Sequence, residues 1–312
     1  MIFEDSIIKL ITKVPEFGYS ILKFERQPRK ISNADSKFLY QLNITNHKKR
    51  LEVYYKSKKV YSLCFNPEIV QLELIDNEKN HILQRFIYMC ITKRDRFKLK
   101  IVQYANINRL EFYLDSGELL EIILIPEIKI QKSLINYPFG IEETKRSKIQ
   151  TLDFIWLKNE HMGILYINKN SQRFIINKEN HIIKNILPKR NRYEFAIVIT
   201  NDLQNRKNPL YYVKAYNTKL MGIFTEFNSS ILSKSFLSLD YKVHIDVVNL
   251  WKRNNKTYIR LFNPNNKEEQ VVLKGILINN PLYEVDFNYN IISKLNSNKF
   301  SMNPWEIKTL QF

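Results

Sequence analysis

The sequence predicts an all-β protein built from stacked antiparallel sheets, and three observations support this. Polar and apolar residues alternate with a period of two in many short runs, as in half-buried strands. The chain holds 18 Tyr and 19 Phe, which favour pleated surfaces, and only 6 Gly, so we expect long, regular strands. Strands do not alternate regularly with helices, which argues against a Rossmann sheet or a (β/α) barrel. With 312 residues, the chain can form large β-sandwiches.

Taken in chain order, the predicted elements are nearly all strands. Two stretches have a weakly helical pattern and are predicted as helices, residues 4–14 and 229–239. Single strands with alternating faces are expected at residues 97–101, 110–114, 242–248 and 284–291. Polar turn signals at 168–171 and 263–266 predict hairpins over residues 161–177 and 258–273. A polar segment that ends in proline, residues 201–209, is the best candidate for an interior boundary.

The balance of charge is strongly basic, with 49 Lys+Arg against 31 Asp+Glu and a net charge of +18. Such a charge raises nucleic acid or an anionic membrane as a partner. Lysine dominates over arginine and is spread along the chain, which argues against nucleic acid. In the densest patch, Lys98 and Lys100 alternate with apolar residues, so we interpret it as one solvated strand face.

The expected compartment is the cytoplasm. No stretch approaches the roughly 18 apolar residues that a membrane helix needs, and the acidic residues near the N-terminus do not suit a secretory signal. Cys64 and Cys90 lack CxxC spacing and are either a disulfide or, as we prefer, buried free thiols. Two cysteines in this spacing do not provide a cysteine-based zinc site.

Motifs that would reveal catalysis are missing from the sequence: there is no HExxH, GxSxG, Walker loop or GxGxxG. His244 and Asp246 share one strand face, so they could bind a metal with a further ligand, or form a plain polar surface. Glu142 and Glu143 could line a cleft or end a solvated loop. The three tryptophans are either sugar platforms or core residues, namely Trp156, Trp251 and Trp305.

Five segments in order resemble the β half of glycoside hydrolase family 38, the α-mannosidases. They are VPEFGYSILKF (14–24), the PFG loop with the strand bearing Trp156 (135–157), the predicted hairpin at 161–176, the strand and turn with Arg260 and Asn263 (258–273), and MNPWEIKTLQF (302–312) with Pro304, Glu306, Ile307 and Thr309. The resemblance implies a galactose-mutarotase-like β super-sandwich followed by a smaller C-terminal β-sandwich. The expected domains are a leading strand and linker at 1–30, the super-sandwich at 31–205, and a connecting segment with the terminal sandwich at 206–312.

In this family the zinc ligands and the aspartate nucleophile belong to an N-terminal (β/α) domain, which has no counterpart in this sequence. The resemblance therefore implies that the chain alone is inactive and holds no cofactor and no catalytic residue, and that zinc belongs to a catalytic partner domain. The family arginine after PFG has Thr144 near its place here, with Arg146 two residues on. The candidate substrate contacts are Phe139, Glu143, Arg146 and Trp156.

The favoured function is the non-catalytic β portion of an α-mannosidase-type glycosidase, which completes or stabilises a zinc-dependent catalytic domain or chain. The first alternative is a stand-alone carbohydrate-binding or scaffold protein, and the second is a basic β protein that binds nucleic acid. The expected partners are accordingly the catalytic domain and carbohydrate, with no membrane.

Overall fold

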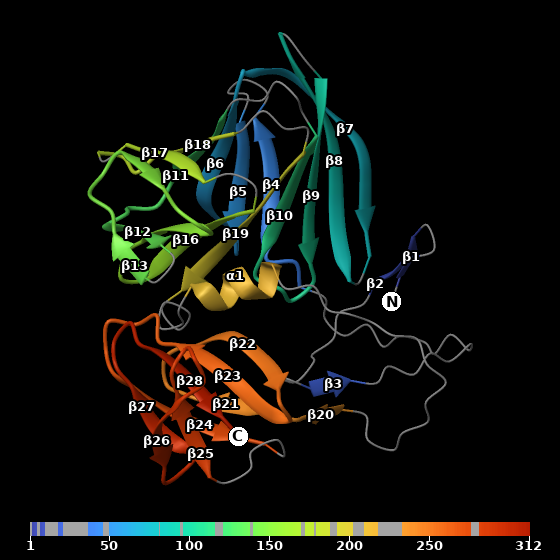
Figure 1. Ribbon diagram of the computed structural model, residues 1–312. Coiled ribbons are helices and arrows are strands. Elements are labelled where there is room, and N and C mark those ends of the chain that lie inside the picture. Colours follow the sequence, from blue (N-terminus) through green and yellow to red (C-terminus); the bar gives the residue numbers. More distant parts are fainter. Residues whose placement is uncertain are drawn as a thin grey trace. The chain divides into compact units, whose positions relative to one another are not determined.

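The computed structural model confirms an all-β chain (Figure 1). It describes residues 2–4, 7–9, 18–20, 37–45, 50–80, 82–93, 96–115, 121–137, 140–169, 172–177, 179–187, 192–201, 209–217, 233–275 and 281–312. The chain divides into a large unit, Ile31–Thr218, and a small unit, Met1–Lys30 with Lys219–Phe312. Among the residues that the structure describes, none forms a helix that could serve as a membrane span.

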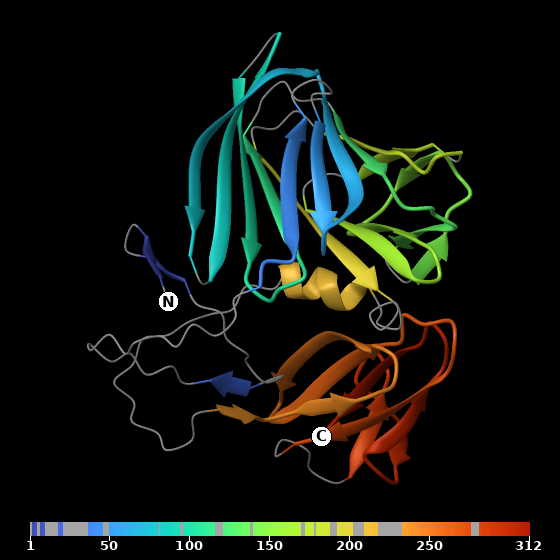
Figure 2. The same cartoon turned by 180° about the vertical axis from the view of Figure 1, so that it is seen from behind.

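The large unit consists of two sheets packed face to face (Figure 2). The nine-stranded sheet has the spatial order β13 (Gly140–Glu143), β12 (Lys132–Tyr137), β15 (Phe154–Lys158), β16 (Met162–Asn168), β19 (Arg192–Asn201), β10 (Leu110–Asp115), β9 (Arg96–Tyr104), β8 (Leu83–Thr92) and β7 (Ile69–Lys79). The seven-stranded sheet has the order β14 (Lys148–Gln150), β17 (Arg173–Ile176), β18 (Ile183–Ile186), β11 (Glu121–Pro126), β6 (Lys58–Asn66), β5 (Arg50–Tyr55) and β4 (Tyr40–Thr45). All paired strands in both sheets are antiparallel.

The middle of the nine-stranded sheet is buried on both faces. Along β15, β16 and β19, alternate residues such as Ile155, Tyr166 and Ile197 face the core between the sheets. The intervening residues, Trp156 and Leu165 among them, form a second cluster with Val213 of α1 (Leu210–Asn217). The helix therefore covers the outer face of the sheet, and these strands read as nearly continuous apolar runs.

The small unit is a second, smaller sandwich. A three-stranded sheet has the order β21 (Ser238–Asp240), β24 (Glu269–Lys274) and β27 (Lys299–Met302). A five-stranded sheet has the order β22 (Asp246–Arg253), β23 (Lys256–Phe262), β28 (Ile307–Gln311), β25 (Leu282–Val285) and β26 (Ile291–Leu295). Two short pairs accompany them: β1 (Ile2–Glu4) with β2 (Ile7–Lys9), and β3 (Gly18–Ser20) with β20 (Ser233–Ser235).

Both predicted helices are wrong where the structure describes them. The segment at 4–14 contributes β2, which pairs with β1, and the segment at 229–239 contributes β20 and the start of β21. Leu237 and Leu239 are buried on either side of half-buried Ser238, so a period of two prevails over the weak helical pattern. The observed helix α1 follows Pro209, whose carbonyl accepts hydrogen bonds from the Tyr212 and Val213 amides.

Two predicted hairpins are instead crossings between sheets. Residues 161–177 form β16 in the nine-stranded sheet and β17 in the seven-stranded sheet. Residues 258–273 likewise divide between the five- and three-stranded sheets as β23 and β24. Each turn signal does mark a chain reversal, but a sandwich can place the two strands on opposite sides of its core.

Strands 97–101 and 110–114 are confirmed, with Phe97, Leu99, Leu110 and Phe112 buried. The single strand expected at 284–291 is wrong, because it contains the turn between β25 and β26. The Asp286 carboxylate accepts hydrogen bonds from the backbone amides of Asn288 and Asn290, both at 2.8 Å, which is the local pairing that favours a turn over a strand.

Candidate functional site

The β12–β13 hairpin carries the first candidate region. Tyr137 pairs with Gly140 across its end, and the candidate Phe139 lies between them, outside the described residues. The hairpin is anchored by buried Asn136, whose side-chain oxygen accepts hydrogen bonds from the backbone amides of Asp153 and Phe154 at 2.9 and 3.0 Å. These hydrogen bonds hold the end of β12 against the start of β15.

Glu143 ends the edge strand β13 with its side chain exposed. Its carboxylate lies 3.5 Å from Lys132 Nζ, and both side chains are about half exposed, so the ion pair contributes little. Burial, together with a hydrogen bond to Glu142, raises the pKa of Tyr137 above its usual value. Glu142 and Glu143 do not converge on one point, since neighbouring residues of a strand face opposite sides.

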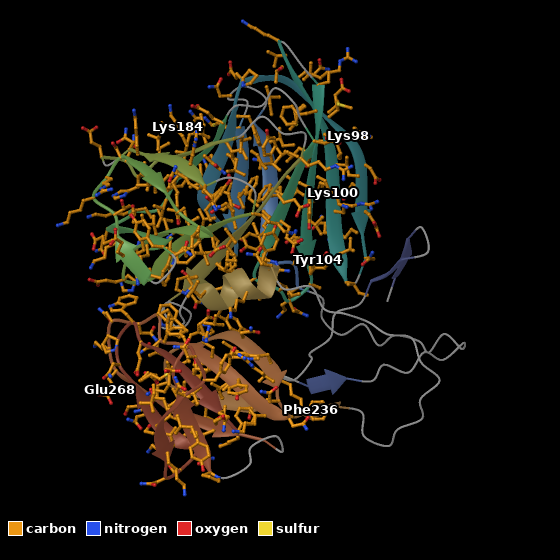
Figure 3. The ribbon with its side chains drawn as sticks, in the orientation of Figure 1. Lys98, Lys100, Tyr104, Lys184, Phe236 and Glu268 are labelled. Carbon is orange, nitrogen blue, oxygen red and sulfur yellow. The ribbon has the colours of Figure 1, made fainter. Side chains whose placement is uncertain are left out.

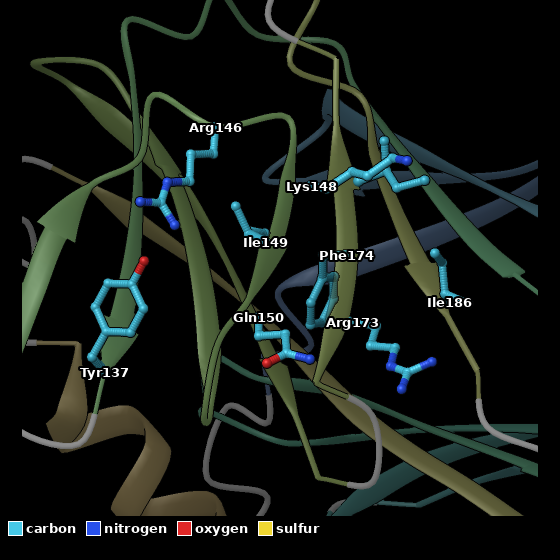
Figure 4. Close-up of a pocket in the computed structure, with 9 residues that line it drawn as sticks. Tyr137, Arg146, Lys148, Ile149, Gln150, Arg173, Phe174 and Ile186 are labelled. Carbon is cyan, nitrogen blue, oxygen red and sulfur yellow. The ribbon is translucent and has the colours of Figure 1, made fainter.

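Arg146 belongs to the segment that joins β13 to β14, and it lines a groove of about 550 Å³. Its backbone amide donates to Thr144 Oγ1 at 3.2 Å, which shapes the turn. Figure 4 shows the Arg146 guanidinium and the Tyr137 hydroxyl directed toward one another from different segments. The groove is lined by Tyr137, Arg146, Lys148, Ile149, Gln150, Arg173, Phe174, Ile175 and Ile186.

Of the four candidate contacts, Arg146 is the one that the structure places in this groove. Glu143 and Trp156 are not among its lining residues. The groove lies at the end of the seven-stranded sheet, where β14 is the edge strand. Its volume falls in the range of small-ligand sites, about 300–1,000 Å³.

Trp156 is a core residue, 4% exposed, in the cluster covered by α1. Its indole nitrogen donates to Thr200 Oγ1 at 3.2 Å, and Lys158 Nζ lies 4.4 Å from the ring centroid. Burial lowers the pKa of that lysine, with neighbouring Lys132 adding to the effect. Trp156 therefore offers no open face to a sugar in this chain. Of the two roles that the sequence allowed for this residue, sugar platform or core residue, the structure shows the core residue.

The other two tryptophans lie in the small unit. Trp251 stacks on Tyr258 with ring centroids 5.6 Å apart, and the Arg260 guanidinium lies 5.3 Å from its centroid. Arg260 also lies 4.6 Å from the centroid of Phe287, so its charge sits near two rings. Trp305 is 40% exposed in the turn before β28. Together, Trp251, Tyr258, Arg260 and Phe287 form a continuous aromatic–arginine cluster on the five-stranded sheet.

No group of three His, Cys, Asp or Glu side chains that could hold a metal gathers within the described ranges. His244 and Asp246 are neighbours, with Nε2 and Oδ1 3.8 Å apart, but Tyr241 Oη lies 3.4 Å from His244 Nδ1. These residues do not fit a zinc site. Cys64 and Cys90 are both free thiols, and burial raises the pKa of each.

Comparison with known proteins places these features in a family context. Residues 242–310 match the sequence model described as the glycosyl hydrolases family 38 C-terminal β-sandwich domain. The C-terminal part of the chain is therefore similar to this domain. The resemblance to the C-terminal β portion of family 38, read from the five segments, is thereby confirmed. No curated protein sequence matches the chain.

Solved structures agree on the fold over most of the length. A family 38 protein from Enterococcus faecalis has a TM-score of 0.66 at 8% identity and matches 88% of this chain. An α-mannosidase from Enterococcus faecalis V583 has a TM-score of 0.61, also at 8% identity and 88% coverage. This chain spans 43% and 41% of their respective lengths. At such low identity the likeness shows the fold alone.

Sequence reasoning missed most of the groove. Lys148 and Gln150 alternate with buried Ile149, and Arg173 precedes buried Phe174, so the period-two signal was present in both segments. What the sequence does not contain is the pairing of β14 with β17, which brings Gln150 opposite Arg173. Residues more than twenty positions apart meet only through that register.

Proposed function

We propose that this chain is the non-catalytic β half of an α-mannosidase-type glycoside hydrolase and that it completes or stabilises a zinc-dependent catalytic domain. The match of residues 242–310 to the family 38 domain carries the proposal. The fold likeness over 88% of the chain supports it, and the chain spans less than half of the length of those relatives. The proposal includes a cytoplasmic location for the protein.

The chemistry of the described residues suits a supporting role. Zinc-assisted glycoside hydrolysis needs a metal site and two opposed carboxylates. In the part of the chain that the structure describes, no three metal-ligating side chains gather. We therefore place the zinc, the nucleophile and the acid in the partner domain. Among the candidate contacts of this chain, Arg146 is the one that lines a groove, whereas Trp156 is buried in the core.

The aromatic–arginine cluster of the small unit supports a protein partner. Tyr289 extends it, with its ring centroid 5.1 Å from that of Tyr258 and 4.2 Å from the Arg253 guanidinium. Phe287 is 67% exposed, although it contacts Arg260. Trp, Tyr and Arg are the residues that dominate protein interfaces, and an exposed apolar patch of this kind commonly marks one.

The test is to co-express the chain with a family 38 catalytic domain encoded in the same genome, first sought in the DNA upstream of its gene. We expect a stoichiometric complex by size-exclusion chromatography, with α-mannosidase activity that requires both polypeptides and is lost on chelation of zinc. Phe287→Ala should weaken the complex, while Ile75→Ala, an exposed position in the large unit, should not. If the catalytic domain is fully active and remains monomeric when this chain is present, the proposal is contradicted.

A second candidate function is stand-alone carbohydrate binding, and the groove at β14 favours it. It offers the exposed Tyr137 ring, the Gln150 amide and an apolar floor at Phe174, the mixture that sugar sites use. Saturable sugar binding by the isolated chain, with no association with a catalytic domain, would select this function over the first.

A further inference from the structure

The groove at β14 is surrounded by cations that the fold brings together. On the outer face of β14, β17 and β18, Gln150, Arg173 and Ile186 form one cross-strand row. The adjacent row is Lys148, Ile175 and Lys184. Three cations therefore occupy two adjacent rows of three strands. Directly opposed side chains in such rows have Cβ atoms about 5 Å apart, and diagonal ones lie about 7–8 Å apart.

Two further cations precede β14, Lys145 and Arg146, and both are exposed. Within the described residues, no ion pair joins any of the five cations to a carboxylate, in contrast to Lys59, Lys169 or Lys308 elsewhere in the chain. Glu121 lies opposite Ile186 on this face, and its carboxylate accepts a hydrogen bond from Asn66 at 3.2 Å. Glu142 of β13 is also close to the groove, where it hydrogen-bonds Tyr137.

Like charges gathered on one sheet face without compensation oppose folding. The patch therefore costs the free protein some stability, which an anionic ligand would recover. Arginine is well suited to such a ligand, because its planar guanidinium binds phosphate and sulfate oxygens through two parallel hydrogen bonds. Arg146 and Arg173 both line the groove, as does Lys148.

The size and lining of the groove favour a compact ligand. A volume of about 550 Å³ holds a small saccharide. Tyr137 is 37% exposed, whereas Phe174, the other ring in the lining, is 1% exposed. One exposed ring suits the apolar face of a single sugar, while nucleic acid strands bind to a series of stacking rings.

We propose that the groove lined by Tyr137, Arg146, Lys148 and Arg173 binds a saccharide that carries a phosphate or sulfate group. The saccharide part of this assignment rests on the proposed function, and the anionic part rests on the charges themselves. Arg146 and Arg173 hold the anionic group, Lys148 adds charge, and Tyr137 with Gln150 contacts the sugar.

The test is a titration of the full chain by calorimetry with four probes: mannose 6-phosphate, mannose, inorganic phosphate and a sulfated disaccharide. Mannose 6-phosphate should bind at least about tenfold more tightly than mannose, and the affinity should fall as salt is raised. The phosphate and sulfate probes then identify which anionic group the groove prefers. Equal affinity for mannose and mannose 6-phosphate would overturn the proposal.

Charge-matched variants locate the site. Arg146→Gln, Arg173→Gln and Lys148→Gln should each weaken binding about tenfold, the loss typical of one hydrogen bond to a charged group. Lys98→Gln removes the same charge from an exposed strand position and should leave the affinity unchanged. Figure 3 shows Lys184, beside the groove, and Lys98 at opposite sides of the large unit in that view. Equal losses from Lys148→Gln and Lys98→Gln would contradict a built site.

A short single-stranded DNA completes the experiment. If it displaces mannose 6-phosphate and binds far more tightly, the groove is a nucleic-acid surface and the proposal fails. Neither of these contradicting results would argue against assembly with a catalytic domain, because that complex is measured by chromatography and not by sugar binding. Conversely, loss of that complex leaves the anion titration intact.

Discussion

At the residue scale, Asn136 shows how one polar side chain positions the candidate region. Its side-chain oxygen accepts hydrogen bonds from Thr151 Oγ1 and from the amides of Asp153 and Phe154, and its Nδ2 donates to the Asp153 carboxylate at 2.9 Å. Asn136→Ala would remove the acceptor of the Asp153 and Phe154 amides, whereas Thr151 Oγ1 would keep its bonds to the Asn136 and Phe154 carbonyls. We expect a loss of about 2–4 kcal/mol in the free energy of unfolding, measured by urea denaturation. Asn43→Ala, at an exposed strand position, should change it by less than about 0.5 kcal/mol.

Tyr88 provides a pH-dependent prediction at the same scale. Burial raises its pKa to about 12 from an ordinary value of 10.0, with a smaller contribution from Cys90. Because the pKa of Tyr88 is raised in the folded state, protonated Tyr88 contributes its full stabilisation of the fold below pH 10. This contribution is lost as the pH rises from 10 through 12. Tyr88→Phe cannot ionise, so its free energy of unfolding should fall less across this window, by up to about 2–3 kcal/mol.

Urea denaturation at several pH values between 9 and about 12 measures the effect of Tyr88. Because other buried tyrosines also ionise, the readout is the difference in slope between Tyr88→Phe and the unaltered chain. Tyr211→Phe, at a position 49% exposed, is the control and should follow the unaltered chain. Identical slopes for all three proteins would show that Tyr88 does not couple ionisation to folding.

At the element scale, β28 is the strand on which the small unit depends. It lies between β23 and β25, and Leu310 pairs with Ile259 on one side and Glu284 on the other. Deleting residues 305–312 would thus divide the five-stranded sheet and expose two strand edges, so we expect aggregation, measured by light scattering. The sequence had indicated a paired terminal strand, but only the register shows that it is central.

A point substitution tests β28 more gently. Leu310 is fully buried in the core of the small unit. Leu310→Ala should lower the free energy of unfolding of this unit by about 2–5 kcal/mol. Ile307→Ala, on the same strand but 36% exposed, should cost much less. Similar losses for the two variants would contradict the burial of Leu310.

Elements also show where sequence patterns mislead. Alternation correctly located β9 and β10, because Phe97, Leu99 and Phe112 each face one buried side. Alternation does not assign partners, and the two predicted hairpins, β16–β17 and β23–β24, each bridge two sheets instead. A turn signal reports that the chain reverses, while sheet membership depends on which distant strand completes the hydrogen bonds.

At the scale of the whole molecule, the two units have separate cores. Separate cores predict two unfolding transitions in calorimetry rather than one. Leu310→Ala should lower the transition of the small unit alone, and Asn136→Ala that of the large unit alone. A single transition that both variants shift equally would show that the units unfold together.

The sequence by itself determined the all-β class, the burial faces of its clearest strands and the resemblance to family 38, since these depend on composition, local alternation and short motifs. It also indicated Arg146 as a site residue. Only the tertiary structure decided that Trp156 belongs to the core and that Arg173 joins Lys148 and Gln150 beside the groove. Such meetings depend on the register between strands far apart in the chain, and a local pattern carries no information about its distant partner.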